Sequence, residues 1–263
     1  MLNKLLKYDL KYMLKNMSIF YILAILFAIS TRIFFSLNQT TIINLISQIC
    51  VGCMFSMLAS ILINVIMRSW VRFIDSVYKD ESYLTHTLPV TKKEIYNSKF
   101  IQTLIFFIVS FIVIIISLLI AYYTEERWIM IKGLVNSLST NLNVNTTLFI
   151  IGILAVLFLE IFNVIQSGFL GIILGHKKNN NKIVFSVMYG FACYMISQFI
   201  VLLIIFIIGI FNTGIMDLFK SNMLISNDTI KLLITLAIIS YLSVITLMNI
   251  VCKIEFNKGV NIE

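Results

Sequence analysis

Apolar positions fall in six long runs, separated by short polar segments that hold nearly all the charged residues. A helix needs about 20 mainly apolar residues to cross the hydrocarbon of a bilayer, and each run reaches that length. The pattern therefore predicts an all-α fold, a polytopic membrane bundle with six transmembrane helices. The predicted spans are Met17–Leu37, Ile42–Met67, Phe100–Tyr123, Thr146–Leu174, Ile183–Phe211 and Thr229–Val251.

The segment before the first span, residues 1–16, carries one apolar and one basic stripe at helical spacing. This pattern is typical of an amphipathic helix that lies in the membrane interface, and it predicts a cytoplasmic N-terminal helix of that kind. A plain basic flank to the first span is the alternative. The apolar stripe is Leu2, Leu5, Leu6, Leu10, Met13 and Met17, and the basic stripe is Lys4, Lys7, Lys11 and Lys15.

Composition agrees with a membrane protein. Hydrophobic residues make up 60% of the chain and charged residues 12%, against about 25% charged residues in soluble domains. The net charge of +8 collects next to the predicted spans. We therefore expect membrane lipids, and no nucleic acid, as partners of the basic segments.

The positions of Lys and Arg predict the orientation. Fifteen of the 20 lie on the side that holds the N-terminus, and four lie in the opposite segments. By the positive-inside rule, this bias predicts a multi-pass protein of the cell membrane with both termini cytoplasmic. The fifteen are Lys4, Lys7, Lys11, Lys15, Arg68, Arg72, Lys79, Lys92, Lys93, Lys99, Lys177, Lys178, Lys182, Lys253 and Lys258; the four are Arg127, Lys132, Lys220 and Lys231.

The segments between the spans are short, so we expect a single transmembrane domain over residues 1–263. The largest external segment, 124–145, has no room for a folded domain of its own. The longest polar segment is the predicted cytoplasmic loop 68–99. Its first part continues the second span as an amphipathic helix with Arg68 and Arg72 on the polar face.

The second part of this loop predicts a helix, a break and another helix. Pro89 forces the preceding residue into an extended conformation and so ends the first element. Thr91 with Glu94 three residues later forms a capping box, which starts a new helix at Lys92. The loop would then present exposed apolar and aromatic side chains, which suggests a docking surface. A loop that packs only on its own bundle is the alternative.

The stretch Glu81–Val90, which reads Glu-Ser-Tyr-Leu-Thr-His-Thr-Leu-Pro-Val, followed by Thr91–Lys99, resembles a loop of the permease subunits of the ABC type-2 exporter family. The resemblance is to the Gram-positive bacterial branch, whose permeases carry a similar stretch between their second and third spans. In that family, the loop holds a coupling helix that inserts into a cleft of the ATPase subunit. The resemblance implies that role for Tyr83, Leu84, Thr85, His86, Thr87, Leu88 and Pro89.

The same resemblance implies the partners: ABC ATPase subunits and a second permease subunit, either identical or homologous. The sequence contains no G-x-x-x-x-G-K-[ST] phosphate-binding loop, so a separate ATPase would supply the energy. We expect no enzyme activity, no cofactor and no metal site in this chain. The cargo stays open among peptides, antibiotics and lipid-like molecules. The alternatives are a self-contained secondary transporter or channel, or a membrane scaffold that does not transport.

Polar residues also occur inside the predicted spans. Glu160, Asn163 and Ser167 share one face of the fourth span with Gly171 and Gly175. A charge at mid-membrane is costly, so this face should point into the bundle. It could line a translocation path with a protonatable gate, or it could form hydrogen bonds between helices, which we favour. Gly171 and Gly175 predict a close helix contact.

Arg32 lies near the outer end of the first span. It is at a different predicted depth from Glu160, so we expect its side chain to reach the outer interface instead of pairing across the bundle.

Overall fold

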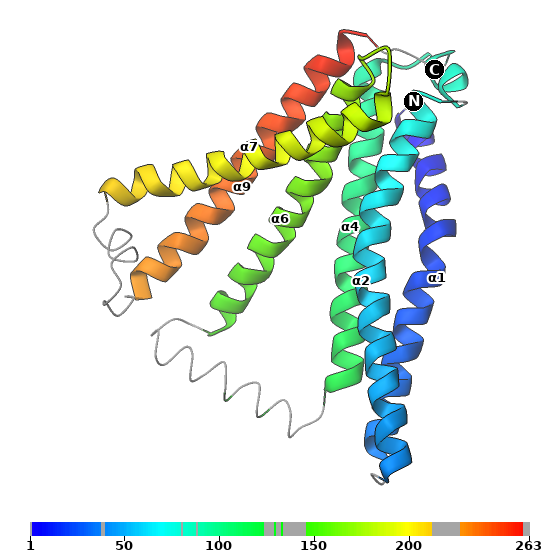
Figure 1. Cartoon of the computed structure of the whole chain (residues 1–263), viewed down its shortest axis with the longest axis vertical. Helices are drawn as coiled ribbons and strands as arrows, with labels where there is room; N and C mark the ends of the chain where they lie inside the picture. Colours follow the sequence, from blue (N-terminus) through cyan, green and yellow to red (C-terminus); the bar gives the residue numbers. More distant parts are fainter. Residues whose placement is uncertain are drawn as a thin grey trace. The chain divides into compact units, whose positions relative to one another are not determined.

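The computed structural model describes residues 2–37, 40–79, 81–87, 89–123, 129, 133, 146–211 and 227–259. Every regular element in these ranges is an α-helix (Figure 1). The helices are α1 (Leu2–Ser36), α2 (Thr41–Val77), α3 (Ser82–Thr87), α4 (Lys92–Tyr122), α6 (Thr146–Gly175), α7 (Lys182–Phe211) and α9 (Asn227–Asn257). The predicted external loop 124–145 lies outside the described residues except for 129 and 133.

Six of these helices are long and apolar enough to cross a membrane, which confirms the predicted six-span bundle. The shortest of them, α6 and α7, have 30 residues each, about 45 Å of helix against about 30 Å of hydrocarbon. The outer faces of the six helices carry large apolar side chains, such as Ile22 of α1 at 63% and Leu202 of α7 at 64% exposure. This surface suits acyl chains, and the protein is a multi-pass α-helical membrane protein.

The helices group into two compact units, and the single transmembrane domain expected over residues 1–263 stays a prediction. Unit 1 is Met1–Trp128 with Ile262–Glu263, and unit 2 is Ile129–Asn261. Unit 1 therefore contains α1, α2, α3 and α4, and unit 2 contains α6, α7 and α9. The grouping depends on contacts between helices that are far apart in sequence, which hydropathy does not report.

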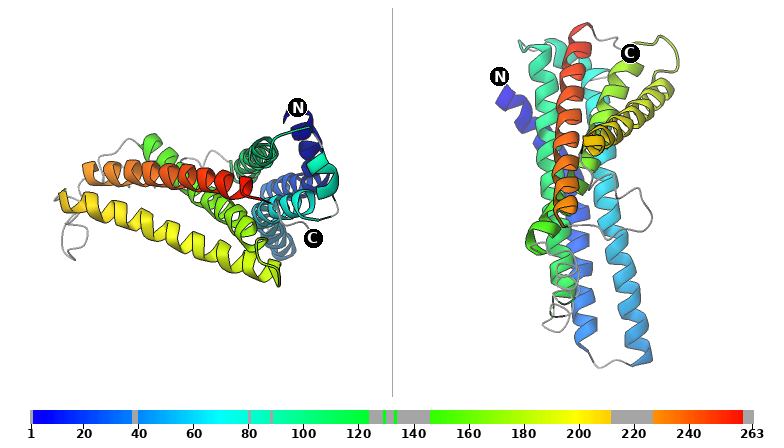
Figure 2. Two further views of the ribbon diagram at one scale, coloured as in Figure 1. Left: turned by 90° about the horizontal axis from the view of Figure 1, so that it is seen from above. Right: turned by 90° about the vertical axis from the view of Figure 1, so that its left-hand side faces the viewer.

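In unit 1, α1 packs along both α2 and α4 (Figures 1 and 2). The face of α1 that makes these contacts buries Met17, Ala24 and Ala28 completely. One polar contact joins the same face to α4, because the Tyr21 hydroxyl lies 2.7 Å from the Ser110 hydroxyl.

The N-terminal segment is helical, and its predicted place in the membrane interface stays a prediction. Residues 2–16 are continuous with the first span in α1. Its lysines are exposed, whereas Asp9 and Met13 on the opposite side are buried.

In unit 2, α6 packs against both α7 and α9. The predicted close contact at Gly171 and Gly175 is confirmed, and its partner is the start of α7. A Cβ atom added to Gly171 would lie 2.6 Å from the backbone oxygen of Ser186, and one added to Gly175 would also collide with Ser186. The two helices can approach this closely only because both positions lack a side chain.

Candidate functional site

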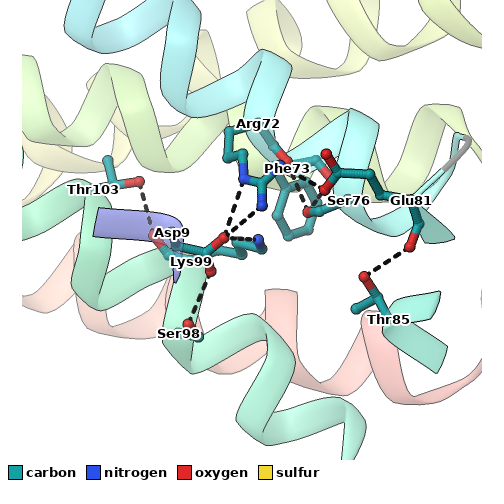
Figure 3. Close-up of polar contacts among 9 residues, drawn as sticks. All are labelled: Asp9, Arg72, Phe73, Ser76, Glu81, Thr85, Ser98, Lys99 and Thr103. Carbon is teal, nitrogen blue, oxygen red and sulfur yellow. Dashed lines mark hydrogen bonds and ion pairs between the residues drawn. The ribbon is translucent and has the colours of Figure 1, made fainter. Parts of the chain in front are cut away.

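A buried carboxylate, Asp9 of α1, joins three helices of unit 1 at the end that carries α3 (Figure 3). The Lys99 ammonium of α4 donates to Asp9 Oδ1 over 2.6 Å. The Arg72 Nε–H of α2 donates to the same oxygen over 3.1 Å. The Ser98 hydroxyl donates to Oδ2 over 3.1 Å. Both oxygens of the carboxylate therefore have donors.

These groups are withdrawn from water. The side chains of Asp9, Lys99 and Arg72 are 2%, 4% and 11% exposed. A buried charge is tolerated only when it is paired and hydrogen-bonded. Arg72 also lies over the ring of Tyr12, with 4.5 Å between the guanidinium carbon and the ring centroid, a cation–π contact that adds attraction.

A fourth charge connects this group to α3. The Arg72 Nη1–H donates to Glu81 Oε2 over 2.6 Å, and Glu81 directly precedes α3. We call Asp9, Arg72, Glu81, Ser98 and Lys99 the Asp9 cluster. It contains two carboxylates and two cations, so its formal charge is zero. Because Arg72 binds both carboxylates, α1 and the start of α3 share one guanidinium.

The short helix α3 has a buried and an exposed side. Ser82 and Thr85 are buried at 0% and 9% exposure, whereas Tyr83 and Leu84 are 65% and 74% exposed. The Thr85 hydroxyl and backbone N–H both donate to the Glu81 carbonyl oxygen over 3.0 Å. Thr87 and Pro89 are exposed. Leu88 and the side chain of His86 lie outside the described part of the chain.

The other end of the loop is fixed as the sequence predicted. Thr91 caps α4: its hydroxyl accepts from the Glu94 N–H over 3.3 Å, and its own N–H donates to Glu94 Oε2 over 2.9 Å. Beneath the loop, the Phe73 ring lies 6.1 Å from that of Tyr78 and 6.4 Å from that of Tyr96. The predicted helix, break and helix are confirmed, and the start of α4 is capped as predicted.

Sequence reasoning missed Asp9 and misplaced its partners. Arg72 was expected on a solvent-facing polar side and Lys99 among the flanking charges of the loop, yet Lys99 is buried and the side chain of Arg72 is only 11% exposed. A signal was present in the sequence. Asp9 is the only acidic residue in the first 16, and it lies opposite the lysine stripe on the side of Met13.

Three of the polar residues predicted inside the spans, Glu160, Asn163 and Ser167, lie in α6 of unit 2. Asn163 is fully buried, and its side-chain amide donates to the Ser197 hydroxyl of α7 over 2.8 Å. This is a hydrogen bond between helices. Ser167 donates to the Val164 carbonyl of its own helix over 2.8 Å, and Glu160 is half-buried.

Arg32 contacts the end of a neighbouring helix. Its guanidinium donates to the backbone oxygens of Tyr123 and Ile120 over 2.8 and 3.2 Å. Both oxygens lie at the C-terminal end of α4, where the negative end of the helix dipole favours a cation. Hydropathy could place Arg32 near the end of its span, but it could not identify this partner.

Within the described ranges, no three His, Cys, Asp or Glu side chains are grouped so that they could hold a metal ion. Comparison of the chain with protein-family models, with curated proteins and with solved structures finds no match.

Proposed function

We propose that this chain is the transmembrane permease subunit of an ATP-binding-cassette exporter of the ABC type-2 kind. A separate ATPase would energise it, and a second permease subunit, identical or homologous, would complete the translocation unit. Both termini and α3 would lie on the cytoplasmic side of the cell membrane. The cargo would be a peptide, an antibiotic or a lipid-like molecule.

The observation that carries this proposal is the pair of exposed side chains on α3. Tyr83 and Leu84 are 65% and 74% exposed on a helix of only six residues. This segment follows the apolar part of α2 and precedes that of α4, so it lies in water beyond the hydrocarbon. Apolar and aromatic side chains exposed there are typical of anchors for a partner protein.

The attachment of α3 supports a mechanical role. A segment that transmits motion must be joined firmly to the helices that it moves. Glu81 binds Arg72, which binds Asp9, and Asp9 binds Lys99. A displacement of α3 by a partner would therefore act on α1, α2 and α4 together.

The proposal is tested by adding charge to the exposed side of α3. Tyr83→Asp with Leu84→Asp should abolish co-purification with the ATPase and ATP-driven transport, because two desolvated carboxylates would oppose docking. Membrane insertion should be unchanged, since neither residue lies in a predicted span. The measurement is the amount of ATPase per permease after affinity purification, with ATP hydrolysis of the complex.

The matched control places the same two carboxylates elsewhere on the same proposed side of the membrane. Asn179→Asp with Asn180→Asp lies in the exposed turn between α6 and α7 and should retain the ATPase. If the α3 variant keeps the wild-type ratio of ATPase and still transports, the proposal is wrong. Transport by the purified chain alone in liposomes would instead indicate a self-contained transporter.

A further inference from the structure

The N-terminal lysines form an exposed stripe that the proposed function does not use. Lys4, Lys7, Lys11 and Lys15 are all exposed. At about 100° per residue they fall within about a quarter turn of α1. No carboxylate pairs with them among the residues that the structure describes. The nearest acid in sequence, Asp9, is buried on the opposite side of the helix.

The same side of α1 continues into the membrane as an apolar surface. Ile22, Leu26, Ile29 and Ile33 follow the lysines on this side, and their side chains are 45% to 63% exposed. The apolar turns on this side of α1 suit contact with acyl chains, and the basic turns that precede them suit contact with lipid headgroups. The stripe therefore begins where the hydrocarbon ends.

Helix length locates the lysines more closely. The 35 residues of α1 extend about 52 Å, which exceeds the hydrocarbon by about 22 Å or 15 residues. The headgroup layer is about 5–7 Å thick on each side. Counted from the hydrocarbon edge after residue 16, Lys15 lies about 2 Å and Lys11 about 8 Å along the axis, so both ammonium groups can reach that layer on their flexible side chains. Lys7 and Lys4 lie about 14 Å and about 19 Å beyond the edge, outside the layer.

We propose that Lys11 and Lys15 form a binding site for the headgroup of an anionic phospholipid. The chemistry is complementary: two ammonium groups that pair with no carboxylate of the described residues can reach the depth of the lipid phosphates, and the neighbouring apolar surface accepts the acyl chains. Lys4 and Lys7 contribute only long-range attraction, which salt screens.

The test is a titration of the full chain in neutral detergent micelles with phosphatidylglycerol, and separately with phosphatidylcholine, followed by native mass spectrometry. Lys11→Gln with Lys15→Gln should weaken phosphatidylglycerol binding about thirtyfold. This figure takes about 1 kcal/mol per lysine near the surface and tenfold per 1.4 kcal/mol. Phosphatidylcholine binding should not change.

Two further variants complete the design. Lys11→Arg with Lys15→Arg keeps the charges and should retain binding, whereas Lys4→Gln with Lys7→Gln should lower it far less than the inner pair. All these side chains are exposed, so the variants should fold. Unchanged phosphatidylglycerol affinity in the inner double variant would overturn the site, as would equal losses from both pairs. Displacement of the lipid by inorganic phosphate would assign a free-anion site instead.

Discussion

At the scale of single residues, Asp9 accepts hydrogen bonds from three side chains on two other helices. Lys99 and Arg72 supply opposite charge, and Ser98 binds the second oxygen. Burying any one of these charged groups alone would cost free energy. Together with Glu81, the charged groups of the cluster have a net charge of zero. The stability of this end of unit 1 therefore depends on the balance of charge more than on any one pair.

The substitution Asp9→Asn should destabilise the protein by about 3 kcal/mol. It keeps the shape of the side chain but leaves Lys99 buried with no compensating charge, and breaking a buried pair from one side costs about 3–5 kcal/mol. Unfolding in mixed micelles of increasing dodecyl sulfate content measures the loss.

Two companion variants separate charge balance from packing. Asp9→Asn combined with Lys99→Met restores neutrality, since Arg72 still pairs with Glu81, and it should recover part of the stability. Lys4→Gln changes an exposed lysine of the same helix and should stay within about 0.5 kcal/mol of wild type. Wild-type stability of the single Asp9→Asn variant would contradict the account of this cluster.

At the scale of the elements, small residues decide which helices approach closely. Gly171 and Gly175 let α6 meet the start of α7, where Ser186 occupies the space that a side chain would need. Gly52 of α2 has a similar sequence setting, in a stripe with Ser56 and Ser60. However, an added Cβ there would meet nothing within 4 Å. The same motif therefore has different consequences in the two helices.

The substitution Gly171→Ala should cost about 1–3 kcal/mol, because the new methyl group forces the two helices apart. Gly52→Ala is the matched control, since it adds the same methyl group to open space and removes a flexible residue from a helix. It should be neutral or slightly stabilising. Thermal unfolding of both purified variants measures the difference, and equal effects at the two sites would refute the close crossing.

At the scale of the whole molecule, local patterns predicted the elements but could not predict how they associate. The six spans follow from the lengths of the apolar runs, and the break before α4 follows from Pro89 and the Thr91 cap. Each of these predictions depends only on residues that are close together in the sequence. Asp9 finds its partners 63 and 90 residues away. Hydropathy assigned Arg72 and Lys99 to the membrane flank because charge near a span normally faces water.

The orientation in the membrane is a prediction at the same scale. A reporter fused at Ser139 should be active only outside the cell, and one fused at Asn180 only inside. The reason is the excess of Lys and Arg in the segments assigned to the cytoplasm. Expression of both fusions in intact cells provides the measurement. Reporters found on the same side of the membrane would rule out the six-span arrangement.

The most direct test of the proposed function is photocrosslinking from α3 in intact cells. A photoreactive phenylalanine analogue replaces Tyr83, which is 65% exposed, or Tyr78, which is 2% exposed and serves as the control. Our account predicts that position 83 crosslinks to a protein with a nucleotide-binding phosphate loop and that position 78 crosslinks only within the chain. Crosslinks from position 83 to lipid or to this chain alone would contradict it.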